Sequence, residues 1–386
     1  MRQTEQNISF KPGLYLHIPF CEHKCAYCDF YSVTNRAQQA QFVDALCNEI
    51  ELTARQLAPQ SSFDTIYFGG GTPSLLKTDQ LRQILKALRS HFPISDNCEI
   101  TLEMNPGATE QQKLPAFKDL GINRLSMGLQ SFDDRQLKFL ERIHTAGQAV
   151  QAFEAARRAG FDNIGLDLIF ALPGQSLPSW QKSLQQAVRL NPEHISAYNL
   201  IFEPNTPFYR LLQQGKIRQQ PEEEELRFFN LTHRILQENG YLHYEVSNFA
   251  RQPALFSRHN YKYWLHVPYL GFGPSAHSFW KGQRWGNVRS LTAYLKKLNK
   301  NEPPFAFKEK LSVQTLEFEH IFLRLRTYQG IDLAYFEKTF ARSFLDSYRK
   351  TIDDLIESGF ARLTQNRFCL TQKGMALADE ILQRFA

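Results

Sequence analysis

Residues 14–28 read LYLHIPFCEHKCAYC, an apolar run followed at once by three closely spaced cysteines. The run Leu14–Ile18 predicts a β-strand, and Cys21, Cys25 and Cys28 occupy the loop after it. Three thiolates at this spacing can hold three irons of a [4Fe–4S] cube, because one short loop can wrap three corners of the cluster. No fourth cysteine lies nearby, so one iron would stay free to bind a small molecule.

Two other uses of the cysteines are less favoured. A structural zinc ion usually takes four ligands in paired spacings, and His23 would have to complete the set from inside the same loop. A disulfide framework is disfavoured because the chain has six cysteines in 386 residues, three of them scattered. The polar segment Met1–Phe10 lacks an apolar signal region, and no stretch approaches the ~18 apolar residues of a membrane span. We therefore expect a cytoplasmic protein.

The bulk composition predicts a large α/β domain with an appendage. The chain has 386 residues, of which 42% are hydrophobic, and a formal net charge of +6. Nucleic-acid binding usually concentrates Lys and Arg in one patch, whereas here the positive charge is spread over the whole chain. We expect no nucleic-acid partner. The charge is compatible with an anionic small ligand without predicting one.

Short β-type runs alternate with helical patterns, which is typical of βαβ units and a parallel sheet. Phe42, Leu46 and Ile50 recur every four residues and predict an amphipathic helix. A second helix is predicted around Ala149–Ala156, with Gly160 as its stop. The predicted strands are Leu14–Ile18, Thr65–Phe68, Glu99–Glu103, Arg124–Gly128, Ile164–Phe170 and His194–Leu200. Six strand–helix units are too few to close the eight-stranded barrel.

The character of the chain changes near Asn301. Pro303-Pro304 reads as a linker, and the residues after it predict helices, then a short hairpin over 359–371, then a last helix to Leu382. Helices followed by a hairpin resemble a winged helix, for which a packing or partner role is favoured over DNA binding. We expect three parts: a core barrel over 1–240, a segment and connection over 241–300, and a C-terminal winged-helix-like domain over 301–386.

The motif Tyr-x-His-Ile-Pro-Phe-Cys-x3-Cys-x-Tyr-Cys, residues 15–28, resembles the radical S-adenosylmethionine (SAM) superfamily, in its oxygen-independent coproporphyrinogen III oxidase branch. The resemblance implies a partial, open (β/α)6 TIM-like barrel. It also implies that the open iron chelates the amino and carboxylate groups of SAM. An electron from the reduced cluster then cleaves SAM to methionine and a 5′-deoxyadenosyl radical, while the protein positions the cofactor and excludes water and oxygen.

The resemblance also assigns SAM contacts at the ends of the predicted strands, where parallel barrels carry their chemistry. Gly70, Gly71 and Thr72 match the motif that contacts the methionine end of SAM, although a tight turn would also explain the glycines. The other matching residues are Glu103 for the methionine amine, Gln130 and Asp167 for the ribose, Arg142 for the carboxylate, Tyr15 near the cluster and Tyr27 against adenine. Taken singly, Glu103 could be a rim salt bridge and Tyr27 a core ring.

Two features distinguish branches of the family. The coproporphyrinogen oxidases carry a further cysteine two positions after the third cluster cysteine, where this chain has Phe30, and a longer N-terminal arm than the thirteen residues found here. The segment His259-Asn260-Tyr261-Lys262-Tyr263-Trp264 resembles the His-Asn-x-x-Tyr-Trp pattern of the HemW-type heme chaperones. A neutral imidazole is a good axial iron ligand, so the resemblance makes His259 a heme-binding candidate. His243, His266 and His277 are further candidates that the sequence does not rank.

These residues lead to one main hypothesis and two alternatives. The main hypothesis is a heme chaperone that binds heme, a [4Fe–4S] cluster on Cys21, Cys25 and Cys28, and SAM. It would pass heme to acceptor hemoproteins, which could include membrane-associated respiratory proteins, and would need an electron donor; no catalytic residue is assigned. The alternatives are an oxygen-independent coproporphyrinogen III oxidase, which Phe30 and the short N-terminus disfavour, and a radical SAM enzyme with an unrelated substrate.

Overall fold

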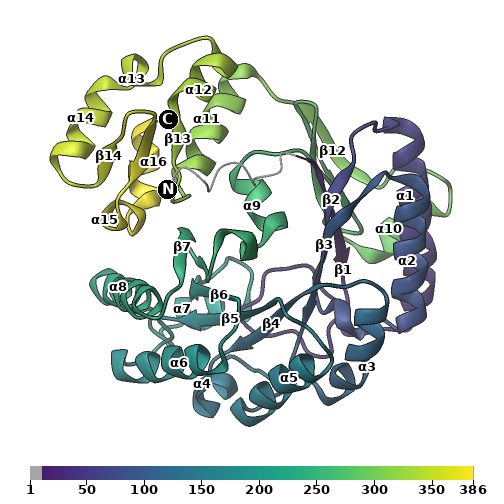
Figure 1. The fold of residues 1–386 in the computed structure, drawn as a ribbon. Helices are drawn as coiled ribbons and strands as arrows, with labels where there is room; N and C mark the ends of the chain where they lie inside the picture. The colour runs from purple at the N-terminus through teal and green to yellow at the C-terminus, as the bar shows by residue number, and fades with distance from the viewer. Residues whose placement is uncertain (1–10, 386) are drawn as a thin grey trace.

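One large sheet of twelve strands organises the fold, as the computed structural model shows for residues 11–385 (Figure 1). Met1–Phe10, from which we predict the lack of an export signal, lies outside the described residues. Six parallel strands in sequential order form the centre of the sheet: β1 (Gly13–Ile18), β2 (Phe63–Gly70), β3 (Ile94–Met104), β4 (Arg124–Gln130), β5 (Ile164–Phe170) and β6 (His194–Asn199). All six predicted strands are therefore confirmed.

The sheet curves, and the helices that connect the parallel strands cover its outer face (Figure 1). These helices are α1 (Gln39–Leu57), η1 (Pro73–Leu75), α2 (Thr78–His91), α3 (Ala108–Asp119), α4 (Asp134–Phe139), α5 (Ala146–Arg158) and α6 (Leu177–Leu190); α7 (Pro207–Gln213) and α8 (Glu222–Glu238) follow β6. This arrangement confirms the predicted open, partial (β/α)6 barrel.

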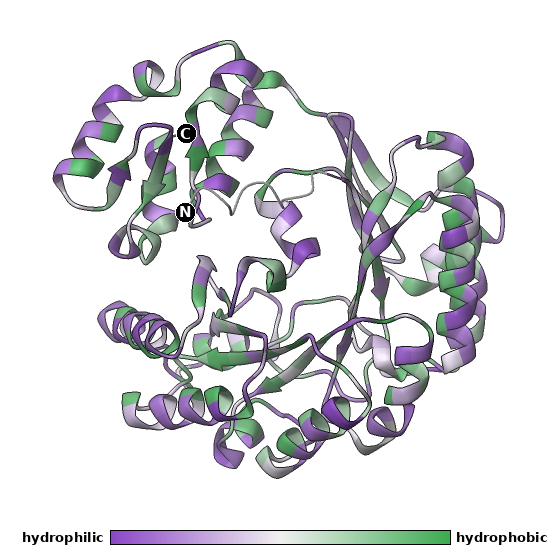
Figure 2. Cartoon of the chain, viewed as in Figure 1, coloured by the Kyte–Doolittle hydropathy of each residue, from purple (hydrophilic) through white to green (hydrophobic). Residues whose placement is uncertain are grey.

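The alternation of side chains along β1 shows how sequence determines the two faces. Leu14, Leu16 and Ile18 are fully buried in the core between sheet and helices, whereas Tyr15 and His17 point to the barrel interior. In Figure 2 the apolar colour follows the strands and the inward sides of the helices, and the polar colour follows the outer sides. The outer face of the sheet is thus the core, and the inner face is free for polar chemistry.

The predicted helix stop at Gly160 has a clear local cause. The α5 helix ends at Arg158, and Gly160 adopts a φ of +83°, in the left-handed region that glycine enters without steric cost. Its amide donates a 2.9 Å hydrogen bond to the carbonyl of Arg157. At the other end, Thr145 and Gln148 form a capping box.

Further strands extend the sheet at both edges. The strands β7 (Leu242–Glu245) and β8 (Asn248–Ala250) lie beyond β6, and β9 (Tyr269–Phe272), β10 (His277–Trp280), β11 (Gln283–Asn287) and β12 (Phe305–Lys310) lie beyond β1. The same segment contains η2 (Pro253–Leu255), α9 (Arg258–Trp264) and α10 (Leu291–Leu298). The segment 241–300 therefore completes the barrel sheet, and because β12 pairs with β11 we place the start of the C-terminal unit after Lys310 instead of at residue 301.

The C-terminal unit has its own core and a small sheet in the order β13-β15-β14. Its elements are α11 (Val313–Arg324), β13 (Ile331–Asp332), α12 (Leu333–Phe340), α13 (Phe344–Ser347), α14 (Arg349–Glu357), β14 (Ala361–Leu363), β15 (Arg367–Leu370), α15 (Gln372–Met375), α16 (Ala378–Leu382) and η3 (Gln383–Phe385). The predicted hairpin is the antiparallel pair β14–β15. Between residues 11 and 385, no helix is both long and apolar enough to cross a membrane.

Candidate functional site

The cysteine loop leaves the carboxyl end of β1 and returns to it through a short neck. The amide of Cys21 donates to the carbonyl of Val33 at 3.0 Å, and the amide of Val33 donates to the carbonyl of Pro19 at 2.7 Å. Within the loop, the amide of Cys28 donates to the carbonyl of Cys25 at 3.1 Å. The chain thus holds all three cysteines on one compact loop at the rim of the barrel, as the sequence predicts.

The three thiols are free, and their donor set fits a cluster. All six cysteines are unpaired; Cys25 is buried, and Cys21 and Cys28 are half-buried. Burial raises the pKa of Cys28 to about 11, and bound iron would deprotonate such a thiol. Within residues 11–385 no three His, Cys, Asp or Glu side chains are placed to share a single metal ion. In a [4Fe–4S] cube each thiolate binds a different iron. The three cysteines therefore need to lie around the cluster and do not have to meet at one point.

A chain of side-chain contacts joins the cysteine loop to the ends of β2, β3 and β4. The hydroxyl of Thr72 lies 3.7 Å from Sγ of Cys21 and accepts a 3.0 Å hydrogen bond from the amide of Asn105. Arg142 donates to Oδ1 of Asn105, to the carbonyl of Gly128 at 2.8 Å, and to Sγ of Cys25 at 3.6 Å. The guanidinium of Arg142 therefore places positive charge beside the thiols, where it would offset the negative charge of thiolate ligands.

Asn105 is a site residue that the sequence reasoning missed. It links Thr72 to Arg142, and it follows the predicted contact Glu103 by two positions at the end of β3. The signal was an amide side chain at the carboxyl end of a barrel strand, where functional groups gather.

The glycine motif lies against the cysteine loop. Gly70 has a φ of +106°, and a Cβ on Gly71 would lie 2.6 Å from the carbonyl oxygen of Phe20. Glycine is therefore required at both positions, by conformation at the first and by close backbone approach at the second. The amides of Gly71 and Thr72 donate to the carbonyls of Ile18 and Phe20, at 2.8 and 2.7 Å. These two amides hold the cysteine loop, so the motif acts at least partly as the tight turn that the sequence left open.

The predicted acids face the barrel interior, next to aromatic hydroxyls. Tyr67 donates a 2.7 Å hydrogen bond to Glu103, and the ring of Tyr15 stacks on that of Tyr67 with centroids 6.1 Å apart. Burial raises the pKa of Glu103 to about 7 and also raises the pKa of Asp167, which accepts hydrogen bonds from Ser126. The interior thus carries carboxyl groups whose ionised forms would gain from a cationic or hydroxyl-bearing ligand.

Two further predicted contacts have contrasting surroundings. Gln130 has a φ of +67°, and its side-chain amide has no hydrogen-bond partner within residues 11–385. Tyr27 packs in an apolar cluster, with its ring centroid 6.3 Å from that of Phe208. Gln130 is thus free to bind a ligand. The Tyr27 ring has apolar neighbours, but its hydroxyl lies at the guanidinium of Arg142 beside the cysteine loop, so its contact with adenine stays a prediction.

Arg124, at the start of β4, is a second residue that the sequence reasoning missed. Its side chain is 1% exposed, and its Nε and Nη1 atoms have no hydrogen-bond partner within residues 11–385. A buried guanidinium normally has several partners. From the sequence, β4 looks like an ordinary apolar strand. Only the sheet register shows that Arg124 faces the same interior as Glu103 and Asp167.

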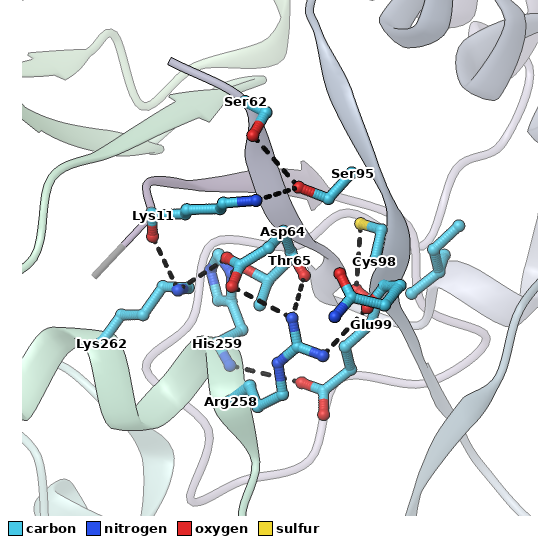
Figure 3. A network of polar contacts seen from close by, with 12 residues as sticks. Lys11, Ser62, Asp64, Thr65, Ser95, Cys98, Glu99, Arg258, His259 and Lys262 are labelled. Atoms are coloured by element: carbon cyan, nitrogen blue, oxygen red, sulfur yellow. Dashed lines mark hydrogen bonds and ion pairs between the residues drawn. The ribbon is translucent and has the colours of Figure 1, made fainter. Parts of the chain in front are cut away.

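The structure places His259 at the amino-terminal end of β1 and β2, away from the cysteine loop. The imidazole is 1% exposed; Nδ1 lies 2.8 Å from the hydroxyl of Thr65, and Nε2 lies 2.9 Å from the hydroxyl of Tyr263. Burial lowers the pKa of His259 to about 3, so the ring is neutral. Its backbone amide donates to Glu99, and neighbouring Arg258 and Lys262 pair with Asp64 (Figure 3). The helix α9 is thus fixed to the barrel through polar contacts, and His259 is not accessible to a ligand in this arrangement.

Comparison with known proteins identifies the family. A model described as the radical SAM superfamily matches residues 15–187, and one described as the HemN C-terminal domain matches residues 311–377. The chain is 35% identical to the heme chaperone HemW of Bacillus subtilis, over 96% of this chain and 98% of that protein, and 34% identical to HemW of Lactococcus lactis, over 96% of each.

One similar solved structure is the coproporphyrinogen III oxidase HemN of Escherichia coli, which is described as a radical SAM enzyme. It superposes with a TM-score of 0.84 and 25% sequence identity, over 98% of this chain and 91% of that one. This likeness extends over the barrel and the C-terminal unit together, whereas the identity over nearly the full length is higher with the HemW proteins. The chain therefore belongs to the HemW family of the radical SAM superfamily.

Proposed function

We propose that this protein is a heme chaperone that binds a [4Fe–4S] cluster, SAM and heme, and passes heme to acceptor hemoproteins in the cytoplasm or at a membrane. The observation that carries the proposal is the identity of 35% over nearly the whole chain with a relative named for this role. The acceptors and the electron donor would be partners that the chain meets transiently. Heme is cargo in this proposal, whereas the cluster and SAM are resident.

Cys21, Cys25 and Cys28 would hold the cluster, which supplies one electron and an open iron site when bound. Arg142 and Thr72 hold the thiols from the barrel side, and the hydrogen-bonded neck at Val33 keeps the loop closed. These contacts support a preformed cluster site, because most of the loop is fixed by the chain itself.

SAM would lie between the cysteine loop and the carboxyl ends of β2 to β5. Glu103 would accept from the methionine amine, and Gln130 and Asp167 would bind the ribose hydroxyls. Tyr67 and Ser126 support the two acids from behind, through hydrogen bonds of 2.7 Å and 3.1 Å. Tyr15, Tyr27, Gly70 and Gly71 would form the walls of this site.

Direct coordination of heme by His259 stays a prediction, and the structure adds a condition to it. Both imidazole nitrogens are engaged, so α9 would have to leave the barrel before the ring could meet an iron. Without such a movement, His259 would influence heme binding only through Tyr263, whose hydroxyl it holds.

The test is an anaerobic titration of heme into the cluster-loaded protein, followed by transfer to an apo-hemoprotein and by an assay for coproporphyrinogen decarboxylation on the same sample. Stoichiometric heme binding, transfer to the acceptor and no decarboxylation would support the chaperone. Decarboxylation without specific heme binding would overturn it in favour of the oxidase. If the sample shows neither heme binding nor decarboxylation, the remaining hypothesis is a radical SAM enzyme with an unrelated substrate.

A further inference from the structure

A pocket lies beside the cysteine loop, on the inner face of the strands that extend the sheet beyond β1. It has a volume of about 240 Å³ and is open to solvent. Its walls come from β1, from the residues just after Cys28, from the end of α9, from β9 and the β9–β10 turn, and from the start of β10. Tyr15 of β1, assigned above to the SAM site, also lines this pocket. The lining residues that matter here are Phe30, Tyr263, Tyr269, His277 and Arg289.

Two histidines line this pocket: His17, which is buried with both ring nitrogens in hydrogen-bond contact, and His277, which an outside ligand can reach. The side chain of His277 is exposed, and it has no hydrogen-bond partner within residues 11–385. The pairing of β10 with β11 explains where the imidazole of His277 lies. His277 pairs with Gly286, and a Cβ on Gly286 would lie 3.1 Å from the imidazole. The glycine therefore leaves the space that the ring occupies.

The other ten histidines are less suited to meet an external metal. His259 is buried and doubly engaged; His243 faces His233, with their Nδ1 atoms 3.0 Å apart; and His266 pairs with Glu319 at 3.3 Å. His17 is buried with two hydrogen-bond partners, His144 and His194 are buried with one partner each, and His320 is buried beside Tyr335. His23 pairs with Glu141 in the cysteine loop, and His91 ends α2 on the outer face of the barrel.

The chemistry of the pocket matches a metalloporphyrin. A neutral imidazole is the usual axial ligand of heme iron, and partial burial and the nearby Arg284 keep the pKa of His277 below its ordinary value. Phe30 is 68% exposed at the mouth, and Tyr263, Tyr269 and Phe307 offer further flat faces to a macrocycle. Arg289 is exposed; it pairs with the carboxylate of Asp29 at 3.4 Å and donates a 3.0 Å hydrogen bond to the carbonyl of the same residue. A propionate would take the place of these surface contacts.

We propose that His277 is the axial ligand of heme iron and that this open pocket, with Phe30 and Arg289 at its mouth, is the heme site. The proposal rests on the heme-chaperone function proposed above. Transfer is then a ligand exchange: the bond from His277 to iron breaks as a bond from the acceptor's ligand forms, with no electron transferred. An open pocket suits this step, because the acceptor can reach the iron before the heme has left.

The same geometry gives His259 an indirect role. Its Nε2 atom holds the hydroxyl of Tyr263, and Tyr263 lines the pocket. His259 is thus a positioning residue for the pocket wall, which accounts for a His-x-x-x-Tyr spacing on one face of α9.

The experiment is a hemin titration of the purified full-length chain, followed by absorbance and electron paramagnetic resonance, for the wild type, His277→Ala and His91→Ala. We expect His277→Ala to lower heme affinity by more than about tenfold and to lose the histidine-ligated spectrum. Added imidazole should restore that spectrum, because the small ligand can enter the vacated space. His91→Ala, an alteration of a histidine remote from the pocket, should behave as the wild type. His259→Ala should weaken binding but keep the histidine-ligated spectrum.

The outcomes separate the two proposals. Failure of the wild type to bind heme would overturn the chaperone function and this site together. If the wild type binds heme tightly and the spectrum of His277→Ala is unchanged, only the assignment of the site is wrong. Loss of the spectrum in His259→Ala or Tyr269→Phe would then identify the residue that binds the iron. As a second measure, Arg289→Ala should reduce affinity for heme but not for its dimethyl ester; equal losses for both would contradict the assigned role of Arg289.

Discussion

The hydroxyl of Tyr67 donates a 2.7 Å hydrogen bond to Oε1 of Glu103 inside the barrel. Burial outweighs this bond and raises the pKa of Glu103 to about 7, so the carboxyl group is only partly ionised near neutral pH. The N–H groups of an amine held on the open iron would donate more strongly to the ionised form. We therefore expect SAM affinity to rise as the pH increases from 6 to 8.

Glu103→Gln should remove this pH dependence and weaken SAM binding roughly ten- to a hundredfold, the value of a charge-assisted hydrogen bond of about 1.5–3 kcal/mol. Anaerobic calorimetry at several pH values would measure both effects. Glu49→Gln is a matched control, because Glu49 is also a buried acid with a pKa raised to about 7 but lies between α1 and β9. A pH-independent affinity in the wild type would contradict the assignment of Glu103.

Glu49 itself predicts how stability depends on pH. It accepts hydrogen bonds from the amide of Gly273, from Asn287 and from Tyr294, yet burial raises its pKa to about 7. A raised pKa in the folded state means that the folded chain holds its proton more tightly than the unfolded chain. The stabilising contribution of protonated Glu49 is therefore complete below the ordinary value of 4.5 and is lost as the pH rises through about 7.

We expect the free energy of unfolding to fall between pH 5 and pH 7.5, and to fall less steeply in Glu49→Gln. Urea denaturation followed by circular dichroism at several pH values measures this. Glu103 and Glu245 have pKa values raised in the same direction and would leave part of the slope in the variant. Identical slopes for the wild type and Glu49→Gln would show that Glu49 is already ionised in the folded chain at low pH.

The cluster assignment predicts a difference between cysteines. Cys21→Ala should abolish the visible absorbance of the reconstituted cluster, because it removes one of three thiolates on the loop. Cys47→Ala alters a free, half-buried cysteine on α1 and should keep the absorbance. Equal iron and sulfide contents in the two variants would contradict the three-cysteine site.

The sequence predicted the parallel strands and the outer helices because their apolar residues recur at the spacing of a buried face. Leu14, Leu16 and Ile18 alternate with polar interior residues, and Phe42, Leu46 and Ile50 recur every four positions. The edge strands β9 to β12 were missed because their pairing is long-range: β9 lies next to β1 only in the folded sheet. For the same reason, the start of the C-terminal unit predicted at residue 301 differs from its placement after Lys310.

The candidate site could be predicted only where a local motif carries it. The cysteine spacing is local, whereas the link from Cys21 through Thr72, Asn105 and Arg142 to Cys25 joins four loops. For the histidines, the sequence could not show which side chains are exposed in the folded chain. The motif favoured His259 over His277, and burial of the first and openness of the second appear only when α9 packs against β2.

The anchoring of α9 gives the last prediction. Lys262 lies 2.7 Å from Asp64, with their side chains 3% and 1% exposed. Removal of the carboxylate breaks a buried ion pair, and this typically costs about 3–5 kcal/mol. We therefore expect Asp64→Asn to lower the free energy of unfolding by about that amount.

A double variant separates the pair from the packing around it. Asp64→Asn combined with Lys262→Met should recover much of the loss, since an apolar side chain of similar length needs no counter-ion. Asp79→Asn is the control, because its pair with Arg82 is exposed and worth less than about 1 kcal/mol. Urea denaturation measures all three. If the double variant is as unstable as Asp64→Asn, the loss comes from Arg258, the second partner of Asp64, which then fixes α9 to the barrel in place of Lys262.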